Sequence, residues 1–163
     1  RVGGGSPKEM GQIFIEAQQF KGTSLIEILQ NCVIFNDGCF NHLTDKDVKE
    51  DKQIFLEHGK PMIFGKNRDK GLVLKGLKLE VVTIGENGVT QEDLLVHNAK
   101  EKDPTLHYML VRMEYPLATG VIRSFDDVTL EEREDALTAQ VKANSSFTKT
   151  DDLFFSGETY EVK

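Results

Sequence analysis

A cysteine preceded by two polar amides is the strongest chemical feature of this sequence. Gln30, Asn31 and Cys32 follow an apolar stretch, residues 23–29, and precede a turn at residues 36–38. A thiolate can act as a nucleophile or as a soft metal ligand. The carboxyl end of a buried strand is also where open α/β sheets place their ligands. A free cysteine is nevertheless more often a buried structural residue than a reactive one.

Each reactive interpretation of Cys32 needs a second group. A nucleophile needs a base within hydrogen-bond reach, and His42 is the nearest histidine in the sequence. A metal site needs further soft ligands, yet the spacing of Cys32 and Cys39 matches no compact zinc or iron–sulfur motif. If Cys32 binds a metal, we expect its other ligands to lie on sequence outside this chain. The remaining histidines are interpreted as surface or packing residues: His58, His97 and His107.

Other patterns that carry chemistry are absent from the sequence. The glycines of residues 3–5 precede a helix, but no strand precedes them and no Lys-Ser/Thr follows, so no phosphate-binding loop is predicted. The acidic residues between 45 and 51 are interpreted as a solvated surface. No pair of carboxylates and no Ser/His/Asp arrangement stands out, so we assign no catalytic residue.

Residues 23–29 are expected to form the buried strand that positions Cys32. A helix should precede it, because Ser6, Pro7 and Glu9 match a capping box with proline at the first helical position. Apolar residues at helical spacing extend that helix to about Phe20. A helix that leads into a near-continuous apolar strand is typical of a doubly wound parallel sheet. Since no further strands of such a sheet are evident downstream, we expect this chain to be the end of something larger.

The rest of the chain predicts a small α+β extension with an antiparallel hairpin. Its alternating and apolar runs indicate short strands, and its capping signals indicate helices. The expected elements are a helical turn near residues 51–57, strands at 61–65, 72–74 and 77–84, helices at 90–98, 103–115 and 129–144, a strand or extended arm at 120–124, and apolar islands at 153–155 and at 160 and 162.

Composition limits the classes of function. The chain has 163 residues, of which 39% are hydrophobic, and a net charge of −7. That charge argues against nucleic-acid or anionic-membrane partners. No apolar run approaches the roughly 18 residues needed to span a bilayer. Two cysteines form no disulfide framework, so we expect a reducing, cytoplasmic location. A start at Arg1 that runs into three glycines suggests a fragment whose natural start lies upstream.

Several segments of the sequence together carry a family signature. They are residues 21–38 (KGTSLIEILQNCVIFNDG), 56–61 (LEHGKP), 65–71 (GKNRDKG), 94–97 (LLVH), 103–105 (DPT), 120–123 (GVIR) and 156–162 (SGETYEV). This combination resembles the β subunit of 2-oxoacid:ferredoxin oxidoreductases, and most closely the 2-oxoglutarate type. In the last segment Tyr160 stands where the family more usually has Trp.

The resemblance implies a chemistry that the residues alone do not reveal. Such subunits bind thiamine diphosphate with Mg²⁺ and a 4Fe–4S cluster. Together with an α subunit they oxidatively decarboxylate a 2-oxoacid onto coenzyme A and pass electrons through the cluster to ferredoxin. The family's cluster is held by an N-terminal Cys-x-x-Cys pair, a third cysteine and a fourth that matches Cys32. The resemblance therefore makes Cys32 a cluster ligand, places Gln30 and Asn31 near the cluster, and leaves Cys39 as a non-ligand.

The departures from the family matter as much as the matches. The thiamine-diphosphate and Mg²⁺ motif, Gly-Asp-Gly followed by Asn, is absent, and so are the other three cluster cysteines. The resemblance thus covers the C-terminal half of such a subunit. Residues 1–40 would end the thiamine-diphosphate-binding domain, and residues 41–163 would form the extension. We expect the isolated chain to be inactive and to bind no cofactor. A non-catalytic module for subunit association or scaffolding, and a thiol enzyme that uses Cys32 and His42, remain alternatives.

Overall fold

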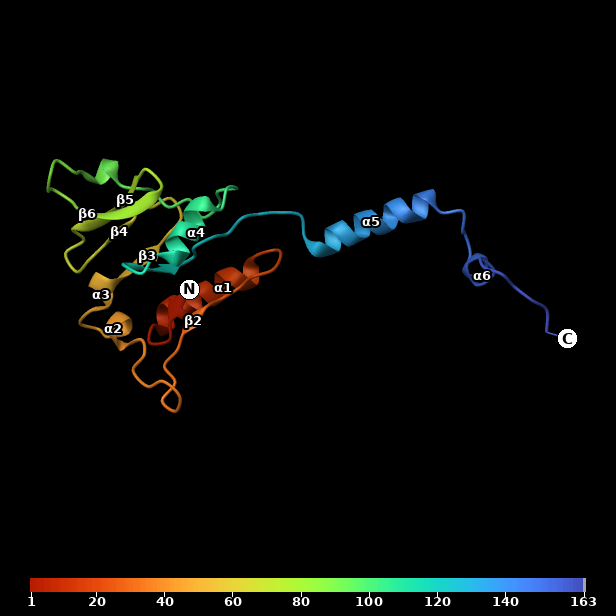
Figure 1. Cartoon of the computed structure of the whole chain (residues 1–163), viewed down its shortest axis with the longest axis horizontal. Coiled ribbons are helices and arrows are strands. Elements are labelled where there is room, and N and C mark those ends of the chain that lie inside the picture. Colours follow the sequence, from red (N-terminus) through yellow and green to blue (C-terminus); the bar gives the residue numbers. More distant parts are fainter. Residues whose placement is uncertain (163) are drawn as a thin grey trace. The chain divides into compact units, whose positions relative to one another are not determined.

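The computed structural model describes residues 1–162 and divides the chain into two compact units. The first is Arg1–Asp126, and the second begins at Asp127 (Figure 1). The predicted boundary between residues 40 and 41 concerns the domains of the family and stays a prediction. No helix among residues 1–162 combines the length and the apolar character needed to cross a membrane.

Helix α1 (Pro7–Gln19) is confirmed, but its predicted capping box is wrong. Ser6 is the N-cap residue, yet its side chain accepts no backbone hydrogen bond. Instead the Lys49 ammonium donates to Ser6 Oγ at 2.6 Å and to both carboxylate oxygens of Glu9 at 2.9 Å. The two side chains of the predicted capping box therefore bind the Lys49 ammonium and not the backbone N–H groups of the helix. This contact also joins the start of α1 to helix α3 (Lys49–Lys52).

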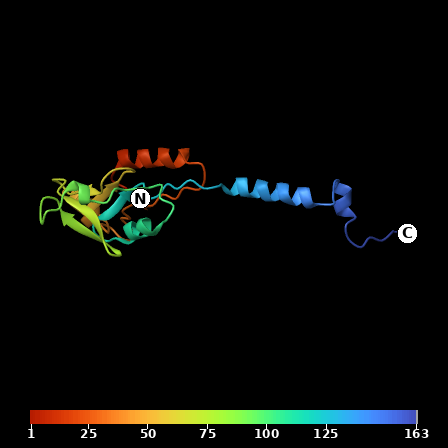
Figure 2. The same cartoon turned by 90° about the horizontal axis from the view of Figure 1, so that it is seen from above.

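The predicted buried strand at residues 23–29 is mostly wrong. Only β2 (Ile28–Leu29) is a strand, and it pairs in parallel with the equally short β1 (Val2–Gly3). Leu29 is 9% exposed, whereas Leu25 is 95% exposed. A strand is buried only where neighbouring elements cover both its edges and its faces. Within residues 1–162 only β1 pairs with β2, so the predicted strand lacks the neighbours that would bury it. Figure 2 shows α1 running alongside this part of the chain.

A second parallel pair lies at the centre of the first unit. Strand β3 (Gln53–Leu56) pairs with β7 (Leu117–Gly120), and Ile54 and Ala118 are each 0% exposed. The predicted helical turn near residues 51–57 is therefore wrong, because α3 ends at Lys52. A short apolar run that is buried on both faces shows no alternation of apolar and polar residues. The hydrophobic pattern therefore cannot distinguish a strand from a helix there. For residues 120–124, predicted as a short strand or an extended arm, the strand alternative is wrong, because β7 ends at Gly120 and residues 121–124 belong to no strand.

The antiparallel hairpin is confirmed, with its strands close to the predicted positions. Strand β5 (Lys70–Lys75) pairs with β4 (Ile63–Phe64) on one side and with β6 (Lys78–Thr83) on the other. The charged turn of residues 65–69 separates β4 from β5, and the two-residue turn Gly76-Leu77 separates β5 from β6. Turn residues of these kinds make the strand boundaries readable from the sequence. The main core cluster includes side chains from this sheet, from the parallel pair and from helix α4 (Thr105–Arg112): Ile54, Leu56, Met62, Phe64, Leu72, Leu110 and Ala118.

Two further helix predictions have different outcomes. Helix α4 is confirmed, and it buries Leu110 as its predicted apolar face requires. The helix predicted at residues 90–98 is wrong, because the structure forms only the 3-10 turn η1 (Gln91–Asp93). The chain is extended from Leu94, whose side chain is 5% exposed. The short helix α2 (Asn41–Thr44) was not predicted.

The second unit consists of α5 (Leu130–Asn144) and α6 (Thr150–Phe154). The capping box that predicted α5 is confirmed: the Glu132 N–H donates to Thr129 Oγ1 at 3.2 Å, and the Thr129 N–H donates to Glu132 Oε2 at 3.0 Å. No described residue of this unit is buried. With its parallel and antiparallel pairs and its helices, the described chain has the predicted α/β class. The assignment of residues 1–40 to a thiamine-diphosphate-binding domain stays a prediction.

Candidate functional site

Cys32 lies on an exposed loop directly after β2, so its interpretation as a buried structural thiol is wrong for this chain. The Asn36 N–H donates to the carbonyl oxygen of Cys32 at 2.9 Å. Backbone N–H groups of Phe35 and Ile34, with a smaller contribution from Asn36, lower the pKa of the Cys32 thiol from its ordinary value. Hydrogen bonds to a thiolate favour the charged form, which is the form that binds metals.

The two amides before Cys32 differ in their surroundings. Asn31 Nδ2 donates to Asp37 Oδ1 at 2.7 Å, and the Gly38 N–H donates to Asn31 Oδ1 at 2.8 Å. The Asn31 side chain is therefore bound within its own loop. Gln30 is exposed. The prediction that both amides lie near a cluster is not tested by these contacts.

The structure brings no base or co-ligand set to Cys32 within residues 1–162. No group of three or more His, Cys, Asp or Glu residues there could hold a metal ion. His42 lies on α2, and it is not among the causes of the lowered pKa of Cys32. Cys39 is a free, partly exposed thiol. The thiol-enzyme hypothesis therefore has no supporting contact.

These findings test how well the implied cofactors fit the described residues. One exposed thiol with backbone N–H donors has the chemistry of one corner of an iron–sulfur cluster. A whole cluster needs three further thiolates, and the sequence has only one other cysteine. Likewise no acidic group gathered in the described chain fits Mg²⁺ with a diphosphate. The described residues thus fit a single ligand position and not a complete site.

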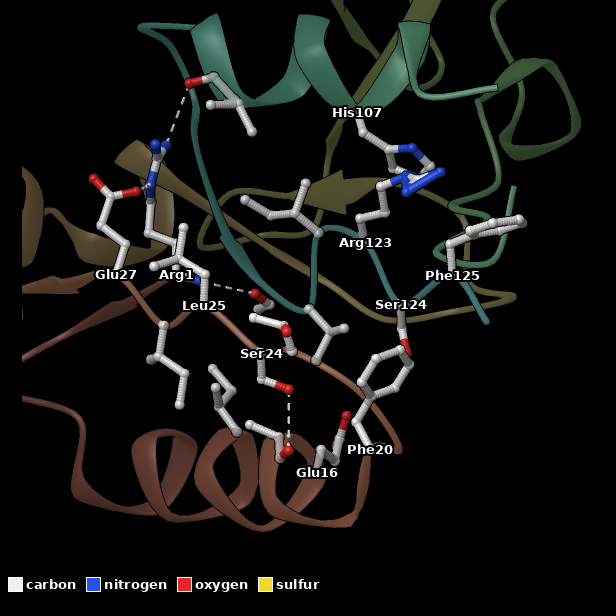
Figure 3. A pocket seen from close by; sticks show the side chains of 18 of the residues that line it. Arg1, Glu16, Phe20, Ser24, Leu25, Glu27, His107, Arg123, Ser124 and Phe125 are labelled. Atoms are coloured by element: carbon white, nitrogen blue, oxygen red, sulfur yellow. Dashed lines mark hydrogen bonds and ion pairs between the residues drawn. The ribbon is translucent and has the colours of Figure 1, made fainter. Parts of the chain in front are cut away.

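A cavity of about 590 Å³ in the first unit was not predicted from the sequence. It lies between the end of α1, residues 23–27, α4 and residues 120–125 (Figure 3). Inside it Arg1 Nε pairs with Glu27 Oε2 at 2.7 Å, and Ser24 Oγ donates to the Ala17 carbonyl at 3.1 Å. Because its walls come from these four segments and from Arg1, no local pattern could have revealed it. Its charged lining is partly paired, and it contains no cysteine.

Two of the four histidines are packing residues, as interpreted from the sequence. His97 is 1% exposed and His107 is 4% exposed. Each ring is hydrogen-bonded through Nε2 to a backbone carbonyl at 2.9 Å, from Val121 and from Asn98 respectively. Neither histidine contributes to a gathered metal-binding group among the described residues.

Comparison with known proteins places this geometry in context. No family model and no solved structure matches the chain. The chain is 35% identical over 133 residues to the 2-oxoglutarate oxidoreductase subunit KorB of Mycobacterium tuberculosis (strain ATCC 25618 / H37Rv). The match covers 81% of this chain and 35% of that subunit, so the chain spans about a third of the length of this curated relative. The predicted resemblance is therefore confirmed: over most of its length the chain is a relative of a 2-oxoglutarate oxidoreductase subunit, of the β type that its motifs indicate.

Proposed function

We propose that this chain functions as part of the β subunit of a 2-oxoglutarate:ferredoxin oxidoreductase. The observation that carries the proposal is its 35% identity over 133 residues to the KorB subunit. The complete enzyme would oxidatively decarboxylate 2-oxoglutarate onto coenzyme A. Its thiamine diphosphate, Mg²⁺ and 4Fe–4S cluster would be bound largely by residues outside this chain, and its electrons would pass to ferredoxin.

Within that enzyme, Cys32 would be one thiolate ligand of the cluster. Its thiol is exposed, and backbone N–H groups from Phe35 and Ile34 favour its charged form. Hydrogen bonds to cluster sulfurs are among the factors that set cluster potentials in proteins. The chain by itself would be inactive, because one thiolate cannot hold a four-iron cluster and the described residues offer no site for the diphosphate.

The experiment uses the complete complex of the β subunit with its α partner. Cys32→Ala should lose most of the iron and the visible absorbance of the cluster, and with them electron transfer to ferredoxin. Cys39→Ala is the matched control, because Cys39 follows in the same region and is predicted to be a non-ligand. Retention of the full cluster content in Cys32→Ala would refute the assignment of Cys32 as a ligand.

A second candidate function is a module for subunit association or scaffolding. The observation that favours it is the exposed apolar surface of the second unit, where Phe154 is 77% exposed and Val162 is 88% exposed. Isolated apolar groups on polar sequence commonly dock onto a partner surface. The reading frame of the complete subunit distinguishes the two functions. The presence of the upstream Gly-Asp-Gly and Cys-x-x-Cys motifs supports the enzyme, and their absence supports the scaffold.

A further inference from the structure

Strand β1 has a neighbour on each side at the point where it borders the cavity. On one side the Val2 N–H donates to the Glu27 carbonyl at 2.9 Å, within the parallel pairing with β2. On the other side the main chains of Arg1 and Gly120 exchange hydrogen bonds of 2.8 and 3.0 Å. An exchange of two bonds between the same two residues is the pattern of an antiparallel pair. The start of β1 is therefore a central strand position and not an edge.

The cavity lies in line with β1, on its N-terminal side. Its lining includes Arg1, the segment that leads into β2 and the segment that follows β7: residues 23–27 and residues 120–125. These two segments are the direct continuations of the two neighbours of β1. A strand that continued β1 beyond Arg1 would therefore run between them, through the cavity.

The pairing registers extend into the cavity without a conflict. Because Val2 pairs with Ile28, the second position before Arg1 falls opposite Leu25. In the antiparallel register of Arg1 with Gly120, the same position falls opposite Ile122. Among the described residues, neither Leu25 nor Ile122 has a partner for its main-chain N–H or carbonyl group. A strand in this register would bond to both residues.

Apolar side chains border the cavity on two opposite sides. Figure 3 shows α1 on one side and α4 on the other, and the apolar residues that they contribute are Ile13, Ala17, Phe20, Tyr108 and Val111. Leu25 also lines the cavity and is 95% exposed. A strand that is covered on both faces carries a near-continuous apolar sequence. The walls of the cavity therefore suit an apolar strand.

Arg1 closes one end of this path, which favours one kind of occupant. A strand from another molecule in this register would end against the main chain of Arg1 and bury its own charged terminus there, which is costly. A segment that is covalently continuous with Arg1 enters in register and buries no terminus. The relative KorB has ample further sequence, because the match covers 35% of that subunit.

We propose that this cavity is the place of an apolar β-strand, formed in the complete subunit by the few residues that directly precede Arg1. This inference rests on the proposed function, because it takes the chain as part of a longer β subunit. The strand would continue β1 and pair with residues 23–27 on one side and with Ile122 on the other. Residues 23–27 would then form the buried strand that their apolar sequence predicts.

The first test compares hydrogen exchange in the complete complex of α and β subunits with that in the 163-residue chain. The amides of Leu25 and Ile122 should exchange at least about 100-fold more slowly in the complex, because the added strand accepts both. The amide of Gly76 is the matched control, since this residue is exposed in a hairpin turn and should exchange alike in both samples. Equal exchange of Leu25 and Ile122 in the two samples would overturn the proposal.

The second test identifies the occupant by a disulfide in the complete β subunit. The first position before Arg1 falls opposite Val121 as a non-hydrogen-bonded pair, whose Cα atoms lie about 4.5 Å apart. A cysteine at that position should therefore form a disulfide with Val121→Cys under mild oxidation, as peptide mapping would show. Leu74→Cys is the matched control, because Leu74 is 48% exposed on β5 and does not line the cavity. This control should form no disulfide with the same upstream cysteine.

Each combination of results decides the proposal. Protection of Leu25 and Ile122 without the disulfide would assign the cavity to another segment or another molecule, and would overturn the proposed occupant. Neither readout depends on the cluster, so the inference and the proposed function can fail separately. If Cys32→Ala loses the cluster but the complex shows neither protection nor disulfide, only the strand is refuted. If the complete subunit lacks the upstream motifs, the enzyme function fails while both tests still decide the strand.

Discussion

Gly120 passes so close to Leu56 that a Cβ atom on the glycine would lie 2.5 Å from the Leu56 carbonyl oxygen and 2.9 Å from its nitrogen. These residues are the last matched pair in the parallel register of β3 and β7. The Gly120 φ of 90° also lies in the left-handed region that favours glycine. Gly120 in addition exchanges hydrogen bonds with the main chain of Arg1, at 2.8 and 3.0 Å. The glycine thus lets three backbone segments meet at one point.

Gly120→Ala should therefore destabilise the first unit strongly. The new methyl group would clash with backbone, which cannot move aside as a flexible side chain can, and the φ angle would add strain. We expect a loss of roughly 3 kcal/mol or more in the free energy of unfolding by chemical denaturation. Gly5→Ala is the control, because nothing lies within 4 Å of the position that its new methyl group would take, so it should change stability little. Equal stability of the two variants would contradict the close approach.

The buried histidine pair predicts a pH dependence of stability. The rings of His97 and His107 meet edge to face with centroids 6.0 Å apart. Burial, assisted by the neighbouring His107 and His58, lowers the pKa of His97 from its ordinary 6.5, although its bond to the Val121 carbonyl opposes this. The folded state therefore binds fewer protons than the unfolded chain just below pH 6.5.

Stability from His97 should accordingly be complete above its unfolded pKa and should be lost as the pH falls through the lower folded pKa. Denaturation midpoints measured at about pH 7.5 and about pH 5 should show the decline. His97→Gln cannot titrate, and its amide can still donate to the Val121 carbonyl, so this variant should show a weaker decline. A variant whose decline equals that of the parent would mean that other groups cause it.

The contact between Lys49 and the start of α1 predicts that Ser6 stabilises the protein through Lys49 and not as a helix cap. Ser6→Ala should cost about 1 kcal/mol in the parent and much less in a Lys49→Met background. A double-mutant cycle by chemical denaturation gives the coupling energy directly. If Ser6→Ala costs the same in both backgrounds, the serine acts as a cap or not at all. Asn67→Ala provides a non-coupled reference in the same background.

The apolar end of the second unit predicts a role in assembly of the complete enzyme. Leu153 and Phe155 are 59% and 71% exposed, so their removal deprives the described chain of little buried surface. Deleting residues 153–162 should weaken association of the α and β subunits in sedimentation experiments while leaving the unfolding midpoint of the first unit unchanged. As a control, Leu137→Ala alters an exposed apolar residue of α5 outside the deleted segment. Unchanged assembly after the deletion would rule out the role.

The sequence predicted those elements whose boundaries are marked by a short local motif, such as a capping box or a turn. The capping box at Thr129 begins α5, and the turn at residues 67–69 separates β4 from β5. Cys32 was also identified from the sequence, because a thiol after an apolar stretch is unusual wherever it occurs. The family resemblance was confirmed because it depends on motifs along the chain and not on how they pack.

What the sequence by itself determined was therefore the α/β class, the hairpin, the longer helices and Cys32 as the residue of interest. Only the tertiary structure decided that residues 23–27 are not a strand, that Ser6 accepts a hydrogen bond from Lys49, and that the Asn31 amide binds Asp37 across the Cys32 loop. The physical reason is that each of these depends on a partner distant in sequence or on the direction of a side chain. Ser6 and Lys49 lie 43 residues apart in the sequence. No local periodicity or capping pattern can therefore predict that the Ser6 hydroxyl binds the Lys49 ammonium and not the helix backbone.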